Sequence, residues 1–228
     1  MNAELTNERY SRQKDIVPAD RIAACKAMVV GVGAIGRQAA LQLAAMGIQQ
    51  LDLADFDIVE ASNLASQGYL EKDLNRLKVE ATADLCRQIN SGIQIQVVPA
   101  RFRRSMDTGN AVFCAVDSID SRRLIWDSVK DRVSFFCDAR MNGEVLRVLT
   151  ACDAGSRRHY PTTLFHSDEA FTGPCTAKTT IYCASIAAGL MLAQFTRHLR
   201  QIPVDCDIQL NLLTSELGVL NGDSRQGA

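Results

Sequence analysis

The sequence has no excess of charge of either sign and no long apolar run. Its 25 Lys and Arg residues balance 26 Asp and Glu residues, which gives a net charge of −1. Overall charge therefore provides no attraction to nucleic acid or to an acidic membrane surface. The most apolar helical stretch, about residues 182–195, is shorter than the roughly 20 residues that cross a bilayer. The polar N-terminus lacks the apolar core of a signal peptide, so we expect a cytoplasmic protein with no membrane partner.

Paired cysteines are also lacking. None of the eight cysteines stands in a C-x-x-C pair. A chain of 228 residues is too long for a miniprotein that depends on disulfides. We therefore expect most of the cysteines to be buried as small apolar residues.

The sequence does contain an alternation of strand and helix patterns. Short apolar or alternating runs predict strands at 27–31, 50–55, 93–97, 111–116, 133–137 and 144–151, and apolar stripes predict helices at 35–46, at 73–90 and from 118 onward. This alternation predicts an α/β fold, a Rossmann-like and mostly parallel sheet with helices on both faces. Residues 152–174 lack periodicity and are predicted to form a long loop. A C-terminal helix at 176–199 and an antiparallel hairpin of strands 208–213 and 217–220 are expected to extend the sheet.

We expect a single domain over residues 1–228. A composition of 47% hydrophobic and 22% charged residues is that of a globular chain, and no repeat or flexible linker divides it. The expected parts are an N-terminal helical arm (1–26), a nucleotide-binding core (27–151), a crossover loop (152–175), a C-terminal helix with strands (176–220) and a disordered tail (221–228).

A glycine-rich turn follows the first predicted strand. Its residues are Gly31-Val32-Gly33-Ala34-Ile35-Gly36. Glycines permit a tight turn and close approach of backbone to phosphate, and the helix N-terminus presents free N–H groups to an anion. Asp55 ends the next strand, 19 residues after Gly36, where a carboxylate can bind a ribose hydroxyl. The pattern indicates a nucleotide, most simply NAD. An ordinary tight turn with Asp55 as a capping residue is the alternative without a ligand.

Further motifs stand in a fixed order around this core. They are Arg9-Tyr10-Ser11-Arg12-Gln13, the run from Phe56 to Leu64, the run from Asn75 to Glu80, Ala115-Val116-Asp117-Ser118, and Arg140-Met141-Asn142-Gly143-Glu144. In this order they resemble the ThiF/MoeB family, the bacterial relatives of the ubiquitin-activating enzymes. The resemblance extends from Arg9 to about Cys175.

The resemblance implies an adenylyltransferase that uses ATP and Mg²⁺. Members of the family adenylate the C-terminal carboxylate of a ubiquitin-like or sulfur-carrier protein ending in Gly-Gly, which a conjugating enzyme can then receive. The implied roles are as follows: Gly31, Gly33 and Gly36 lie beside the phosphates, Asp55 binds the ribose, Asn63 contacts the nucleotide, Lys78 reaches the phosphates, Asp117 accompanies magnesium, and Arg12 enters the active site of a partner subunit. The position of Arg12 implies a homodimer.

The chemistry requires these residue types independently. A carboxylate that attacks the α-phosphate is an anion approaching an anion, so cations must offset the repulsion. Lys78 offers a compact charge and Arg12 a planar fork for phosphate oxygens. Asp117, at the carboxyl end of a parallel strand, can hold hydrated Mg²⁺. Each also has a structural interpretation: Lys78 as a solvated helix residue, Asp117 as a helix N-cap, and Arg12 as a surface charge.

The chain departs from the family pattern in two places. Family members commonly carry arginine in an Asn-Leu-x-Arg-Gln stretch, where this chain has Ser66, so one expected phosphate cation is missing. Arg76 is a candidate replacement. Many relatives also hold a structural zinc with two C-x-x-C pairs, whereas Cys152 and Cys206 stand alone in this chain. We therefore expect no zinc site.

Cys175 differs from the other cysteines in its position. It stands where the crossover loop is predicted to meet the following helix. A helix N-terminus favours the thiolate form of cysteine, and the resemblance places a crossover cysteine here. Attack of this thiolate on the acyl-adenylate gives a carrier thioester. A packing residue near a helix cap is the alternative.

Our leading hypothesis is a homodimeric, ATP-dependent adenylyltransferase. Its alternatives are a relative that activates a small carboxylate or a modified tRNA base, a non-catalytic scaffold subunit suggested by Ser66, and an NAD-dependent oxidoreductase that rests on the glycine-rich turn and Asp55 alone. The lack of a concentrated basic tail argues against a nucleic-acid partner. Five arginines could still form a basic patch, although a solvated face is the favoured interpretation: Arg101, Arg103, Arg104, Arg157 and Arg158.

Overall fold

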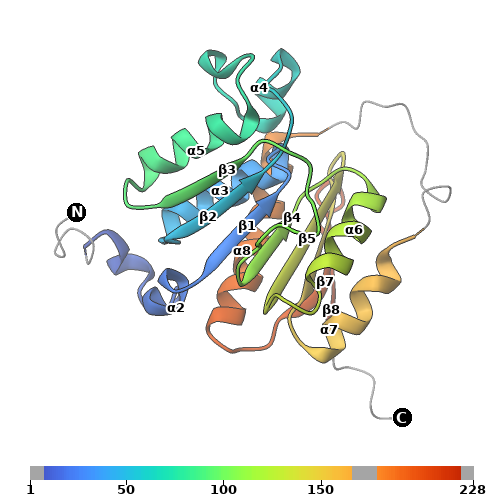
Figure 1. Ribbon diagram of the computed structural model, residues 1–228. Helices are drawn as coiled ribbons and strands as arrows, with labels where there is room; N and C mark the ends of the chain where they lie inside the picture. The colour runs from blue at the N-terminus through green and yellow to red at the C-terminus, as the bar shows by residue number, and fades with distance from the viewer. Residues whose placement is uncertain (1–7, 166–178, 222–228) are drawn as a thin grey trace, which may run out of the picture.

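A mixed β-sheet forms the centre of the molecule (Figure 1). The computed structural model describes residues 8–165 and 179–221, and within these ranges eight strands pair in the order β3-β2-β1-β4-β5-β6-β7-β8. The strands from β3 to β5 in this order are parallel. Those from β5 to β8 are antiparallel. The predicted α/β class, with a parallel core and a C-terminal antiparallel extension, is confirmed.

The strands begin and end close to the residues that the apolar runs predict. Their bounds are β1 Lys26–Val30, β2 Gln50–Ala54, β3 Gln94–Val98, β4 Ala111–Cys114, β5 Phe135–Asn142, β6 Val145–Ala151, β7 Asp205–Asn211 and β8 Glu216–Asn221. In β1 and β2 every residue after the first is buried, as expected for central parallel strands covered on both faces. β5 continues to Asn142, past its predicted end at residue 137, because its second half pairs with β6.

Helices cover both faces of the sheet (Figure 1). On one face, α3 (Ala34–Met46), α5 (Lys78–Ile89) and α8 (Ile181–Leu199) bury their apolar sides in one core cluster. On the other face, α6 (Ile119–Val129) and the 3-10 helix η3 (Tyr160–Thr163) contribute to a second cluster, and α7 (Ala154–His159) directly precedes η3. The Trp126 and Tyr160 rings, with centroids 4.8 Å apart, join α6 to η3 in this second cluster. Each face therefore has its own apolar core.

Shorter elements complete the chain. The N-terminal arm contains η1 (Ser11–Gln13) and α2 (Ala19–Ala23). Between β2 and α5 lie α4 (Ala61–Gln67) and η2 (Glu71–Asp73). Within the described ranges, no helix has both the length and the apolar character that crossing a membrane would need.

Two predictions about the crossover and the tail are wrong. The stretch predicted as a loop over 152–174 contains α7 and η3 before residue 165. Asp153 caps α7, since its carboxylate accepts the Ser156 N–H at 2.8 Å. Asn221, predicted as the first residue of the tail, is instead the last residue of β8 and pairs with Asp205. Residues 166–178 and 222–228 lie outside the described residues.

Two helix starts also differ from prediction. The helix expected from residue 73 begins at Lys78, because residues 75–78 pair with the segment after β2: Ile58 and Leu77 form an antiparallel bridge. The helix expected from residue 176 begins at Ile181, and the Thr180 hydroxyl accepts the Cys183 N–H at 3.4 Å as its N-cap. Local periodicity misses both starts because tertiary pairing and a capping hydroxyl set them.

The expectation for the cysteines holds in the described residues. Six of them are buried, and Cys152 is half-buried. Burial raises the pKa of Cys86, and likewise that of Cys137, to about 12, so both remain protonated packing residues at neutral pH. Cys175 lies outside the described residues.

Candidate functional site

The predicted nucleotide site lies at the carboxyl edge of the parallel strands. In the sheet, Val30 of β1 is paired with Ala54 of β2 on one side and with Cys114 of β4 on the other. The glycine-rich turn, the Asp55 loop and the Asp117 loop therefore leave the sheet side by side. From β1, the strands β2 and β3 are added on one side and β4 and β5 on the other. Open α/β sheets bind ligands at the point where the direction of strand addition changes in this way.

The glycine-rich turn is shaped by two close backbone contacts. Gly31 has a φ of +84°, and a Cβ on it would lie 2.7 Å from the carbonyl oxygen of Ala115. A Cβ on Gly36 would lie 1.8 Å from the carbonyl oxygen of Gly31. Gly33, the N-cap of α3, has only the Gln67 Oε1 at 3.9 Å from its Cβ position. The turn is therefore closed toward β4 and open at the helix N-terminus, where a phosphate can approach.

A Gly36→Ala variant is expected to lose about 1–3 kcal/mol of unfolding free energy, since the added methyl would overlap the Gly31 backbone. Urea denaturation measures the loss. The matched control is Gly189→Ala in α8, where a Cβ meets nothing nearer than the Gln42 Oε1 at 4.0 Å. Alanine favours the helix over glycine, so this control is expected to gain about 0.5–1 kcal/mol. Equal effects in the two helices would contradict the close packing of Gly36.

Asp55 holds the turn through its carboxylate. Its Oδ2 accepts the Val32 N–H at 2.8 Å, and its Oδ1 accepts the Asp57 N–H at 2.9 Å. Burial raises the pKa of Asp55, although the two N–H bonds favour the charged form. A carboxylate has about four acceptor positions, so two remain for a hydroxyl donor such as a ribose.

Lys78 lies at the same edge, at the first position of α5. Only 8% of its side chain is exposed, and its Nζ lies 3.2 Å from the Asp57 Oδ2. The Lys78 N–H also donates to the Asp57 carbonyl at 2.9 Å, so backbone and side chain both fix the pair. This burial argues against the solvated helix residue considered from the sequence. Asp57 is not among the predicted site residues. Its position two residues after Asp55 would have been a reason to include it.

Asn63 and Ser66 lie on α4. The Asn63 Oδ1 accepts the Glu60 N–H at 2.9 Å and so forms part of a capping box. The Ser66 hydroxyl donates to the Ser62 carbonyl at 3.0 Å. Arg76, the candidate replacement for a cation at position 66, forms ion pairs with Asp73 at 3.3 Å and Asp84 at 2.6 Å. Two carboxylates therefore already neutralise the charge of Arg76, which is unfavourable for a residue that should replace the missing phosphate cation at position 66.

Asp117 follows β4 and is exposed. Within the described part of the chain it forms no hydrogen bond or ion pair. The N-cap of α6 is Ser118, whose hydroxyl accepts the Ser121 N–H at 3.1 Å. The alternative interpretation of Asp117 as this N-cap is therefore wrong, and its carboxylate remains available to a cation. Among the described residues, no group of three or more His, Cys, Asp or Glu side chains could hold a metal by itself.

Arg12 lies away from this edge. It is an exposed residue of η1, next to Gln13, whose amide donates to the Met46 carbonyl at 2.8 Å. Met46 ends α3, and Gly33 precedes its start, so about 20 Å of helix separates the two regions. The structure therefore brings together the three glycines, Asp55, Lys78 and Asp117, and does not bring Arg12 to them within one chain.

Two aromatic residues near the site were not predicted. The buried Tyr69 hydroxyl donates to the Val32 carbonyl at 2.6 Å and so helps to fix the glycine-rich turn. Phe56, directly after Asp55, is 48% exposed, with the Arg101 guanidinium 4.3 Å from its ring centroid. The adjacency of Phe56 to Asp55 is visible in the sequence, but the contact with Arg101 depends on the pairing of β2 with β3.

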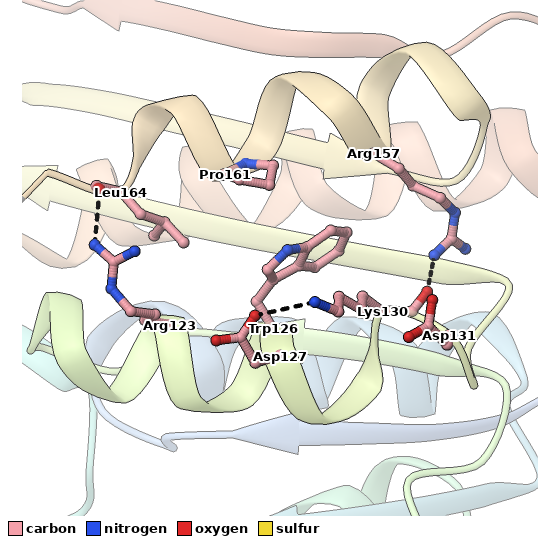
Figure 2. A pocket seen from close by; sticks show the side chains of 8 residues that line it. All are labelled: Arg123, Trp126, Asp127, Lys130, Asp131, Arg157, Pro161 and Leu164. Carbon is pink, nitrogen blue, oxygen red and sulfur yellow. Dashed lines mark hydrogen bonds and ion pairs between the residues drawn. The ribbon is translucent and has the colours of Figure 1, made fainter.

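A separate cavity of about 350 Å³ lies between α6 and η3 (Figure 2). Three cations in its lining already bind protein oxygens. Arg123 donates to the Leu164 carbonyl at 2.8 Å, Lys130 pairs with Asp127 at 3.4 Å, and Arg157 donates to the Lys130 carbonyl. None of the predicted site residues that the structure describes lines this cavity. It belongs to the packing of α6 against the crossover rather than to the nucleotide edge.

Comparison with known proteins identifies relatives of the chain. Residues 10–215 match the ThiF family. A molybdopterin-synthase adenylyltransferase from Haemophilus influenzae is 37% identical over 107 residues, which cover 43% of this chain and 44% of that protein. A SAMP-activating enzyme E1 from Haloferax volcanii is 31% identical over 131 residues, which cover 53% of this chain and 48% of that protein. The chain thus spans less than half the length of either relative.

Solved structures show the same fold. The E. coli MccB structure with MccA-N7isoASN has a TM-score of 0.80 at 17% identity and covers 95% of this chain and 72% of that chain. The structure of PaaA has a TM-score of 0.78 at 22% identity and covers 97% of this chain and 84% of that chain. At these identities the likeness concerns the fold alone.

Proposed function

The chain belongs to the ThiF family, and from this premise we propose that it is an ATP-dependent adenylyltransferase acting on a ubiquitin-like or sulfur-carrier protein ending in Gly-Gly. One observation supports the proposal most directly. Asp55 after β2, Asp117 after β4 and Lys78 at the start of α5 lie at the sheet edge where the open N-terminus of α3 lies. A ribose acceptor, a buried cation and a free carboxylate around an open helix N-terminus are what ATP with a metal ion requires.

The nucleotide is proposed to bind with its phosphates at Gly33 and its ribose at Asp55. The free N–H groups of the first turn of α3 face the phosphates, and the helix dipole adds favourable charge. Asn63 lies on the neighbouring α4, where its amide can turn from the capping box to the nucleotide. Phe56 offers an exposed aromatic face beside Asp55 for the base.

Asp117 is the residue that would hold Mg²⁺. Magnesium keeps most of its waters and is usually bound through one or two carboxylates together with substrate phosphates, which suits a single exposed carboxylate at a strand end. When bound, the ion supplies positive charge for the phosphate oxygens.

In the proposed reaction, a carrier carboxylate oxygen attacks the α-phosphorus of ATP. A new O–P bond forms, the bond to the β-phosphate oxygen breaks, and pyrophosphate leaves. Lys78 offsets the repulsion between the two anions without moving, because Asp57 and burial fix its position. In a second proposed step the Cys175 thiolate attacks the acyl carbon and AMP leaves, which gives a thioester for a conjugating enzyme. That step rests on the family resemblance.

The proposed enzyme is a homodimer in which Arg12 of one subunit serves the nucleotide of the other. The position of Arg12 supports this arrangement, since it is exposed and lies at the far end of α3 from Gly33 in its own chain. A guanidinium fork suits phosphate oxygens that carry developing charge.

The wild-type protein is expected to exchange radiolabelled pyrophosphate into ATP when its carrier and Mg²⁺ are present. Adenylation is reversible while the acyl-adenylate stays bound, so label enters ATP only through the carboxylate of the carrier. The matched control is the same carrier without its terminal Gly-Gly, which is expected to give no exchange. Absence of exchange with every Gly-Gly carrier encoded beside the gene would contradict the proposed activity.

A scaffold subunit that pairs with an active homologue is the second candidate function. Ser66 favours it, because the hydroxyl at this position bonds to its own helix and provides no cation. A scaffold would bind no ATP in calorimetry, whereas the adenylyltransferase binds ATP in preference to NADH. Activation of a small carboxylate or a modified tRNA base would show as exchange that needs no carrier protein.

A further inference from the structure

Arg37 is a buried cation beside the glycine-rich turn. It lies in the first turn of α3 and is only 2% exposed. Its Nε and Nη2 have no hydrogen-bond partner, and within residues 8–165 and 179–221 the side chain forms no ion pair with a carboxylate. Its guanidinium carbon lies 4.6 Å from the centroid of the Tyr69 ring.

The guanidinium lies beside Gly68 and Tyr69, the two residues that follow α4. The Arg37 N–H donates to the Gly33 carbonyl, so the two residues lie one turn apart on nearly the same side of the helix. Helical side chains lean toward the helix N-terminus, which carries that of Arg37 toward Gly33. The loop after α4 packs against both residues. The Arg37 Nη1 lies 3.5 Å from the point where a Cβ on Gly68 would stand, and the Gln67 Oε1 lies 3.9 Å from the point where a Cβ on Gly33 would stand.

A second unpartnered group stands at the same place. The Gln67 Oε1 is buried and has no hydrogen-bond partner. The side-chain amide can be turned so that its NH₂ takes the position of this oxygen, and it would then point a donor toward Gly33. Unpartnered buried polar groups are rare in folded proteins, and two around one helix N-terminus indicate a ligand that accepts hydrogen bonds.

The energetics point to an anionic ligand. A buried guanidinium without a direct ion pair is unfavourable, and the Tyr69 ring offsets only part of that cost. Burial lowers the pKa of Arg37, and the charge of Asp73, which forms no ion pair with Arg37, opposes that shift only in part. An anion at the open face of Gly33 would meet the free N–H groups of α3 and the Gln67 side chain, with the Arg37 charge buried one turn further along the helix.

We propose that Arg37 binds the phosphate chain of the nucleotide and supplies, from α3, the cation that Ser66 does not supply from α4. This inference rests on the proposed function for the identity of the anion, a nucleoside triphosphate. Arg76 is unsuited to the role because Asp73 and Asp84 neutralise it. Arg37 has no such partner, and a desolvated charge acts more strongly on a nearby phosphate than an exposed one.

The test compares Arg37→Met with the wild-type protein in calorimetric titrations of ATP, inorganic pyrophosphate and adenosine. Arg37→Met is expected to weaken the binding of ATP and pyrophosphate by about 10- to 100-fold and to leave adenosine unchanged. Arg37→Lys keeps a charge and is expected to retain part of the preference for ATP over adenosine. Arg76→Met, which removes a paired arginine, is the matched control and is expected to bind all three ligands like wild type.

Urea unfolding without ligand separates phosphate binding from a purely structural role. Methionine replaces an unpaired buried charge with an apolar chain of similar length, so Arg37→Met is expected to unfold at the same or a higher urea concentration. An earlier unfolding midpoint with equal losses for ATP and adenosine would show that Arg37 only supports the fold and would overturn the assignment. Unchanged ATP affinity would overturn it as well.

The same titrations distinguish this inference from the proposed function. Loss of ATP affinity in Arg37→Met, together with a wild-type protein that exchanges no pyrophosphate with any carrier, would overturn the adenylation proposal and leave Arg37 as a phosphate ligand. A wild-type protein that binds neither ATP nor pyrophosphate would overturn both.

Discussion

A Lys78→Met variant is expected to lose carrier-dependent pyrophosphate exchange by at least about 100-fold, with little change in stability. The Lys78 ammonium is a nearly buried point charge at the phosphate edge, held 3.2 Å from the Asp57 carboxylate. In the proposed reaction it offsets the repulsion between an attacking carboxylate and the phosphates. The loss is therefore expected mainly in the rate at saturating ATP rather than in the fold.

The stability of Lys78→Met is predictable from its partner. Asp57 is 46% exposed, so water can solvate its carboxylate once the lysine is gone, and the cost of the lost pair is small. Lys72→Met is the matched control, because Lys72 is an exposed lysine of η2 on the same connection. It is expected to exchange pyrophosphate like wild type. Similar rates for the two methionine variants would remove Lys78 from the proposed machinery.

The sequence predicts the parallel core well because the core depends on local patterns. β1 and β2 are short apolar runs that end at Gly31 and Asp55, and such runs need no knowledge of their neighbours to be recognised. The glycine-rich turn follows from the same strand-turn-helix context. The position of Asp117 after β4 is also visible, although its freedom from capping depends on Ser118 taking that role.

The misjudged parts depend on contacts between distant segments. α7 has six residues, too few for an apolar period, and its polar side chains bind distant groups: Arg157 donates to the Val133 carbonyl and His159 lies 2.9 Å from Asp207. The start of α5 is set by the pairing of residues 75–78 with the chain after β2, including Asn75 at a φ of +65°. This pairing is also what buries Lys78 beside Asp57, so the sequence could name the lysine but not its geometry.

Arg37 illustrates the same limit within a helix that was predicted correctly. An arginine after Gly36 in a run rich in alanine is an unusual charge on a helix that packs on both sides, and this is a signal that the sequence contains. The guanidinium is buried because Gly68 and Tyr69, which directly follow α4, pack against it. Only their arrangement shows that the charge is buried without a direct ion pair.

A mixed dimer of Arg12→Ala and Lys78→Met subunits is expected to be active, although each variant alone is expected to be nearly inactive. If Arg12 acts across the dimer, one site of the mixed dimer combines an intact Lys78 from one subunit with an intact Arg12 from the other. Co-expression with two different affinity tags isolates this species, and its exchange rate is expected to be about half that of wild type. Arg12 is exposed, so its removal is not expected to affect folding.

The reciprocal mixed dimer makes the result decisive. A chain that carries both Arg12→Ala and Lys78→Met, paired with a wild-type chain, has one site without Lys78 and one site served by the mutated Arg12. Action across the dimer therefore predicts almost no exchange from this species, whereas action within one chain predicts about half the wild-type rate. The two mixed dimers contain the same substitutions in the same number, so differences in stability cancel between them. A reversed pattern, with activity only in the reciprocal dimer, would place Arg12 in its own chain's site, which its position at the far end of α3 opposes.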